Sequence, residues 1–206
     1  GPEARLIYAG ILADDGRDEL AASELENLLN ERPEIAGTAY SLLAQLRWRN
    51  LRSNDVEGLD GIKEYTRQAG ELLPKTAEAY FLRALTTATI KDKLALLDEA
   101  LLVDPSHYES YRLRAFTHYA SRKYVKLEHD AIAMVALNPH ESLGYSMRAK
   151  ALVKLSQYEQ ALSEYDRAIA LTDDQETDYV DLITQRCDVL LLMGDYDKVI
   201  EKARDC

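Results

Sequence analysis

Apolar positions recur along most of the chain with the spacing of an amphipathic helix. In the stretch QYEQALSEYDRAIALTDD, residues 157–174, apolar side chains stand at i, i+3, i+4 and i+7 counted from Tyr158. This spacing places one apolar stripe along a helix. Helical patterns of the same kind begin upstream, at Tyr124, and downstream, at Tyr196. The helix at 157–174 is therefore predicted to be part of a repeated unit.

The repeat has a period of about 34 residues. The aligned pairs are Tyr111 with Tyr145, Arg114-Ala115 with Arg148-Ala149, Tyr124 with Tyr158, and Ala136-Leu137 with Ala170-Leu171. Residues 77–107 show the same pattern, but their two halves are out of phase by three residues. We therefore expect a shorter turn between the two helices of that copy.

Six copies are predicted, each made of two antiparallel helices joined by a turn. They span residues 2–35, 37–76, 77–107, 108–141, 142–175 and 178–206. The second copy is degenerate, with about six extra residues between its helices, and the sixth is expected to be truncated. Pro33, Pro74, Pro105 and Pro139 are each expected to end a second helix. Since one helix pair cannot bury its apolar face alone, the copies must stack.

The period and its anchors resemble those of the tetratricopeptide repeat (TPR), over nearly the whole chain. The anchors are clearest in residues 142–175, where they are Tyr145, Ala149, Tyr158, Ala161, Tyr165 and Ala168. Asp173 stands where the family has a closing proline. The resemblance implies an all-α fold, a right-handed α-solenoid of stacked helix-turn-helix repeats that forms a single domain over residues 1–206.

Composition and charge narrow the classes of partner. The chain is 47% hydrophobic and carries 25 basic and 36 acidic residues, for a net charge of −11. Residues 1–36 and 173–206 each contribute −6, which disfavours a nucleic-acid partner. The sequence shows no apolar run long enough for a membrane span and no signal peptide. We expect a cytoplasmic fragment of a longer protein that binds no membrane.

Candidate chemistry is sparse. The sequence has no phosphate-binding glycine loop, nucleophile elbow or cysteine pair with metal-ligand spacing, so we expect no enzyme activity, no cofactor and no metal. The four histidines lie eleven residues apart, and their phase on the predicted helices argues against a metal site. They are His107, His118, His129 and His140. We interpret them as ordinary surface or turn residues, and Cys187 and Cys206 as reduced thiols.

In TPR domains the first helix of each repeat lines a concave groove that holds a peptide or a partner helix. By alignment, the resemblance implies that the groove includes Gln45, Trp48, Arg49, Phe81, Leu85, Arg112, Phe116, Tyr119, Lys150 and Lys154. This predicts a groove of aromatic and basic character. In the alternative interpretation, large residues such as Trp48 and Phe116 pack against a neighbouring repeat.

Some family members grip an acidic C-terminus with a clamp of paired basic and asparagine residues. Arg112 and Lys150 have the required charge, but Leu113, Met147 and Phe116 occupy neighbouring inner positions in place of the asparagines. That departure argues against a clamp.

The predicted function is therefore a protein-protein interaction module that binds a peptide or a helix of a partner protein in the groove. The alternative is a regulatory or substrate-recruiting domain of a larger enzyme, such as a kinase or transferase. RNA binding by a related helical array would need a basic inner face throughout, which the acidic ends disfavour.

Overall fold

The computed structural model describes residues 1–32, 35–49, 56–73, 75–173 and 177–194; the side chains of residues 14, 48–49, 56–59 and 177 lie outside this description. The described residues form eleven α-helices and no strand. The helices are α1 (Pro2–Asp14), α2 (Asp18–Glu31), α3 (Ala36–Arg49), α4 (Val56–Leu72), α5 (Ala77–Thr86), α6 (Ile90–Val103), α7 (Tyr108–Ala120), α8 (Tyr124–Leu137), α9 (Ser142–Lys154), α10 (Tyr158–Ala170) and α11 (Thr177–Met193). The predicted all-α class is confirmed.

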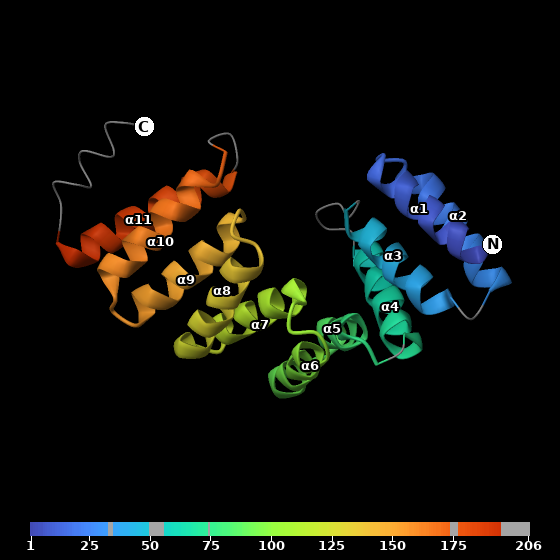
Figure 1. Cartoon of the computed structure of the whole chain (residues 1–206), viewed down its shortest axis with the longest axis horizontal. Helices are drawn as coiled ribbons and strands as arrows, with labels where there is room; N and C mark the ends of the chain where they lie inside the picture. The colour runs from blue at the N-terminus through green and yellow to red at the C-terminus, as the bar shows by residue number, and fades with distance from the viewer. Residues whose placement is uncertain (33–34, 50–55, 74, 174–176, 195–206) are drawn as a thin grey trace. The chain divides into compact units, whose positions relative to one another are not determined.

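The chain divides into two compact units, Gly1–His107 and Tyr108–Cys206. Within each unit every helix packs against the next one along the chain, and Figure 1 shows paired helices such as α9 and α10 lying side by side. Unit 1 holds α1 to α6, and unit 2 holds α7 to α11. The arrangement of all the repeats as one domain over residues 1–206 stays a prediction.

Small residues allow the helices to approach closely. Ala149, Ala161 and Ala168 are completely buried, as the repeat pattern predicts. Tyr165 of α10 is 3% exposed and shares a buried cluster with Ala149, Ala168 and residues of α11, and Tyr145 and Tyr158 pack against the same cluster. Alanine at the crossing points lets backbones come together, and the tyrosines fill the space beside them.

The second helices end close to the prolines, as predicted. Helices α2, α4, α6 and α8 each end two residues before one of the four prolines, at Glu31, Leu72, Val103 and Leu137. A proline restricts the residue before it to extended backbone, so the helix stops there.

In three of the turns, the residue two positions before the second helix has a left-handed backbone conformation. These residues are Gly16, Arg122 and Ser156, with φ of 73°, 57° and 62°. The turns therefore share one backbone geometry, although the sequence signals it with glycine only at Gly16.

The copy at residues 77–107 differs from the prediction. The turn between its two helices has three residues, 87–89, the same number as in the next two copies. The first helix of this copy is shorter than the first helices of those copies. Helix α5 has 10 residues, whereas α7 and α9 have 13. The reason lies in the sequence TTAT at residues 86–89. The hydroxyl of Thr87 donates to the carbonyl of Arg83 at 2.7 Å, and Thr89 caps α6 by accepting from the N–H of Asp92.

An arginine-acid pair recurs with the repeat. Arg114 of α7 donates to Asp130 of α8, with Nη2 2.6 Å from Oδ1, and Arg148 of α9 donates to Glu164 of α10 at 3.0 Å. Both members of the second pair lie one repeat period after those of the first. In the copy before them the position of the acid is taken by Leu96, and Arg83 donates instead to the backbone carbonyl of Gly70 at 2.6 Å.

Candidate functional site

The first helices of unit 1 carry five of the predicted groove residues. Gln45 of α3 is exposed, and Leu85 of α5 is 43% exposed. Phe81 is partly buried, and its ring lies 5.6 Å from that of His107, so part of its surface is used inside the unit. The side chains of Trp48 and Arg49 lie outside the described residues, so their predicted roles stay untested.

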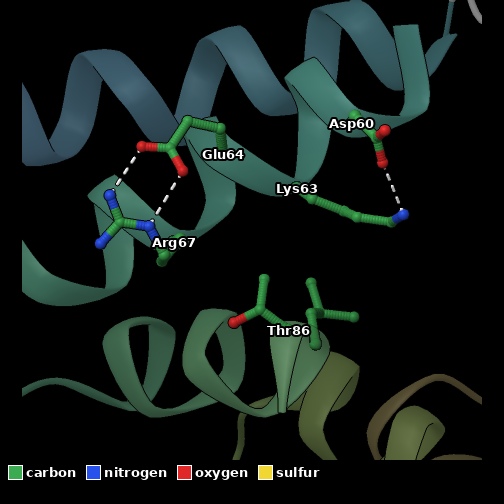
Figure 2. Close-up of a pocket in the computed structure, with 6 residues that line it drawn as sticks. Asp60, Lys63, Glu64, Arg67 and Thr86 are labelled. Atoms are coloured by element: carbon green, nitrogen blue, oxygen red, sulfur yellow. Dashed lines mark hydrogen bonds and ion pairs between the residues drawn. The ribbon is translucent and has the colours of Figure 1, made fainter. Parts of the chain in front are cut away.

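The short helix α5 leaves a pocket beside it. Helix α5 ends three residues after Arg83, whereas α7 ends six residues after the aligned Arg114. Residues of α4 and of the end of α5 line an open pocket of about 360 Å³. Its lining consists of Asp60, Lys63, Glu64 and Arg67 from α4, and Leu85 and Thr86 from α5. Figure 2 shows the charged side chains of α4 on one side of this space and Thr86 on the other. The pocket therefore adjoins one predicted groove residue, Leu85.

The charges of this pocket neutralise one another along α4. Lys63 contacts Asp60 at 2.8 Å, and Arg67 contacts Glu64 at 2.6 Å and Glu71 at 2.7 Å (Figure 2 draws the first two pairs). Hydrogen bonds from Arg67 and Gln68 lower the pKa of Glu64 to about 2. These exposed pairs at i, i+3 and i, i+4 support the helix modestly and leave little free charge for a ligand.

In unit 2 the two aromatic residues of α7 predicted for the groove are open to solvent. Phe116 is 44% exposed and Tyr119 is 39% exposed. Arg112, one turn earlier, is also exposed, and its guanidinium lies 2.7 Å from the carboxylate of Glu109. The side chains of Phe116 and Tyr119 are therefore accessible to a ligand, whereas the charge of Arg112 is already compensated by Glu109.

One of the two lysines of α9 predicted for the groove is influenced by acids of α11. Lys154 is exposed and Lys150 is partly buried. Burial lowers the pKa of Lys150, and the nearby carboxylates of Asp181 and Asp178 oppose that shift. The positive charge expected at Lys150 is therefore influenced by two acids of α11.

An acidic stripe on α11 was not among the predicted groove residues. Asp178, Asp181 and Asp188 are exposed and stand with the partly buried Gln185 at i, i+3, i+7 and i+10, so they share one side of the helix. The hydroxyl of Tyr165 lies 3.3 Å from Oε1 of Gln185. The excess of acids in residues 173–206 and this spacing were the available signals.

The stripe and the aromatic residues of α7 stand on helices that both pack against α9. Ala115 of α7 is buried with Met147 and Ala151 of α9, and Leu182 and Val189 of α11 are buried with Ala149 of α9. Burial raises the pKa of Tyr165 on α10, and Tyr119 and Asp188 raise it further. We call this surface the α7–α9–α11 face. It consists of Arg112, Phe116, Tyr119, Lys150, Lys154, Asp178, Asp181, Gln185 and Asp188.

Solved structures show the same fold. No family model matches the sequence. PilW, a widely conserved type IV pilus biogenesis factor, matches with a TM-score of 0.75 and 17% identity, over 97% of this chain and 89% of PilW. YrrB, a TPR protein with an unusual peptide-binding site, matches with a TM-score of 0.58 and 15% identity, over 83% of this chain and 86% of YrrB. TTC0263, a TPR protein of Thermus thermophilus, matches with a TM-score of 0.59 and 18% identity, over 93% of this chain and all of that one.

This chain has the TPR fold. The likeness agrees with the repeat period and with the buried small residues at the helix crossings. At these identities it establishes the fold, while the ligand must be argued from the side chains.

One histidine of this TPR chain is buried, which corrects the prediction that all four lie at the surface or in turns. His118 is 5% exposed, because it lies on the side of α7 that faces α8. Its Nε2 is 3.8 Å from Oδ2 of Asp130, and its Nδ1 has no hydrogen-bond partner among the described residues. His129 and His140 are exposed, as predicted, and His107 is partly buried.

The burial of His118 predicts a loss of stability in acid. Burial lowers the pKa of His118; the nearby Asp130 opposes the shift, while Arg114, Lys126 and Lys123 add to it. The unfolded chain therefore takes up a proton below about pH 6.5 that the folded chain resists, and the free energy of unfolding falls as pH drops through this range. Urea unfolding at pH 7.5 and 5.5 checks this. In the variant His118→Gln the fall should be smaller, and an equal fall in both proteins would contradict the prediction.

Among the described residues, no group of three metal-ligating side chains is close enough to hold an ion. The described helices include none with the length and hydropathy needed to cross a bilayer.

Proposed function

We propose that this TPR chain is a protein-protein interaction module that binds a peptide or a helix of a partner protein along the faces of its first helices, without catalysis of its own. The observation that carries the proposal is the exposure of Phe116 and Tyr119 on α7, a helix that packs against α9 through the buried Ala115. Large aromatic residues are common anchors of interfaces, because they bury much apolar area at a small cost in side-chain entropy.

YrrB supports the same proposal, since it is a TPR protein with a peptide-binding site. Unit 1 has a pocket next to a predicted groove residue, Leu85. A partner that binds to the first helices of either unit alone is enough for this function.

Site-specific photo-cross-linking tests this location. A benzophenone amino acid replaces Leu85 or Phe116 on first helices, or, as matched controls, Leu102 of α6 or Val125 of α8, which are 78% and 57% exposed. The four proteins are irradiated in lysate of the organism that encodes the chain, and the adducts are identified by mass spectrometry. We expect one partner to be cross-linked from position 85 or 116 and from neither control. Adducts from the controls alone, or from none of the four positions, would refute the proposed surface.

A further inference from the structure

The uncompensated charge of the α7–α9–α11 face is negative. Arg112 is paired with Glu109, and Lys150 lies near both Asp178 and Asp181. Of the ion pairs formed among the described residues, none involves Asp178, Asp181 or Asp188. A ligand at this face therefore meets three carboxylates outside those ion pairs and two lysines, the partly buried Lys150 beside two of the carboxylates and the exposed Lys154. The acids outnumber these bases, so the balance is negative.

The apolar part of the face lies on α7 and is accessible. Phe116 and Tyr119 expose 44% and 39% of their surface. The ring of Tyr119 also meets the edge of the Tyr124 ring at 6.4 Å between centroids. This contact restrains Tyr119 while its other side stays open, so little entropy is lost when a ligand packs on it.

The apolar and acidic parts stand on two helices that both pack against α9. Ala115 of α7 is buried in one cluster with Met147 and Ala151 of α9, and Ala149 of α9 is buried in another with Leu182 and Val189 of α11. The hydroxyl of the buried Tyr165 is hydrogen-bonded to Gln185 of the acidic stripe, and the pKa of Tyr165 is raised by burial and further by Tyr119 and Asp188. A single short segment of a ligand can therefore touch both parts.

We propose that the α7–α9–α11 face binds a partner segment in which an arginine or lysine stands within a few residues of an aromatic or aliphatic side chain. The apolar side chain packs on Phe116 and Tyr119, and the basic group lies against Asp181 and Asp188. This inference rests on the proposed function and adds the chemistry of the partner to it.

Charge complementarity decides between a basic and an acidic partner. An acidic segment would meet one exposed lysine, Lys154, but would have to displace Glu109 to reach Arg112 and would approach the three aspartates of α11. Like charges brought together at an interface suppress binding, whereas a basic segment gains attraction from every aspartate of the stripe. Such an attraction between exposed charges weakens as salt is added.

An array of ten-residue synthetic peptides tests the inference with the whole chain as the labelled probe. Each peptide has Leu, Phe or Trp at its centre, with either two Arg or Lys or two Glu or Asp beside it. We expect the basic peptides to bind at least tenfold more strongly than the acidic ones. The variant Asp181→Lys/Asp188→Lys should lose this preference, and Phe116→Ala/Tyr119→Ala should lose binding to both sets. Circular dichroism confirms that each variant is folded.

The matched control changes net charge equally at another place. Glu3→Lys/Glu99→Lys replaces two exposed acids of unit 1 and should retain the preference for basic peptides. If this control variant also loses the preference for basic peptides, net charge explains the preference and the inference fails. A preference for acidic peptides, or binding that needs Phe116 and Tyr119 but ignores the aspartates, would overturn the inference and leave the proposed function standing. Absence of peptide binding, or binding indifferent to every substitution on this face, would count against both.

Discussion

Replacing Asp130 with alanine is expected to lower the free energy of unfolding by about 3 kcal/mol. The side chain of Asp130 is 3% exposed and accepts three hydrogen bonds from Arg114, at 2.6, 3.1 and 3.1 Å. Removing one member of a buried pair leaves the other charge in a poorly solvated place. The side chain of Arg114 is still 20% exposed. We therefore expect a loss at the lower end of the range that is usual for breaking a buried ion pair. Urea unfolding at neutral pH, followed by circular dichroism, gives the value.

The chain contains its own control for this prediction. Glu164 stands one repeat period after Asp130, but it receives a single hydrogen bond from Arg148, at 3.0 Å, and its Oε2 has no hydrogen-bond partner among the described residues. Glu164→Ala should cost about 1 to 2 kcal/mol, in keeping with the loss of one bond to a charged group. Equal losses at Asp130 and Glu164 would show that the bidentate geometry at Arg114 adds nothing.

The repeat made most of the fold predictable. Helices alternate with turns at a fixed period, and residues such as Ala149 and Ala168 must be small wherever two helices cross. These requirements act on every copy, so they leave the same residue types at the same positions. The helix ends were readable for a related reason, because proline blocks continuation of a helix wherever it stands.

Local exceptions to the repeat were harder to predict. A difference of three residues between copies fits either a shorter turn or a shorter helix, and hydrogen bonds of Thr87 and Thr89 select the shorter helix. The phase of His118 on its predicted helix excluded a metal site but did not show that its side of α7 packs on α8. In both cases the outcome depends on contacts that the sequence period does not describe.

The candidate site was partly predictable. Alignment with the family pattern placed Phe116 and Tyr119 on the first helices, and both are exposed. The alignment treated each helix separately, so it recorded the charges of Arg112 and Lys150 but not the carboxylates opposite them. Whether a basic residue gives a surface positive character depends on its acidic neighbours. Glu109 stands three residues before Arg112 on the same helix, so its spacing was a signal in the sequence. The influence of Asp181 on Lys150 depends instead on how α9 and α11 are packed.

Replacing Gly144 with leucine is expected to lower the free energy of unfolding by about 3 kcal/mol. A Cβ atom at Gly144 of α9 would lie 3.0 Å from Cγ2 of Val135, 3.1 Å from its backbone nitrogen and 3.4 Å from the carbonyl carbon of Met134. Two of these atoms belong to the backbone of α8, so a longer side chain must push the two helices apart and open the core around Met134 and Met147.

The same substitution at Gly61 is the matched control, because a Cβ there would meet nothing within 4 Å. Gly61 lies inside α4 and is exposed, so leucine should raise stability by up to about 1 kcal/mol through its higher helix propensity. Opposite signs at the two glycines would show that Gly144 is required by the contact between α8 and α9. If Gly144→Leu is neutral, these helices can separate at little cost, and the spacing that places Phe116 and Lys150 on one face is set by other contacts.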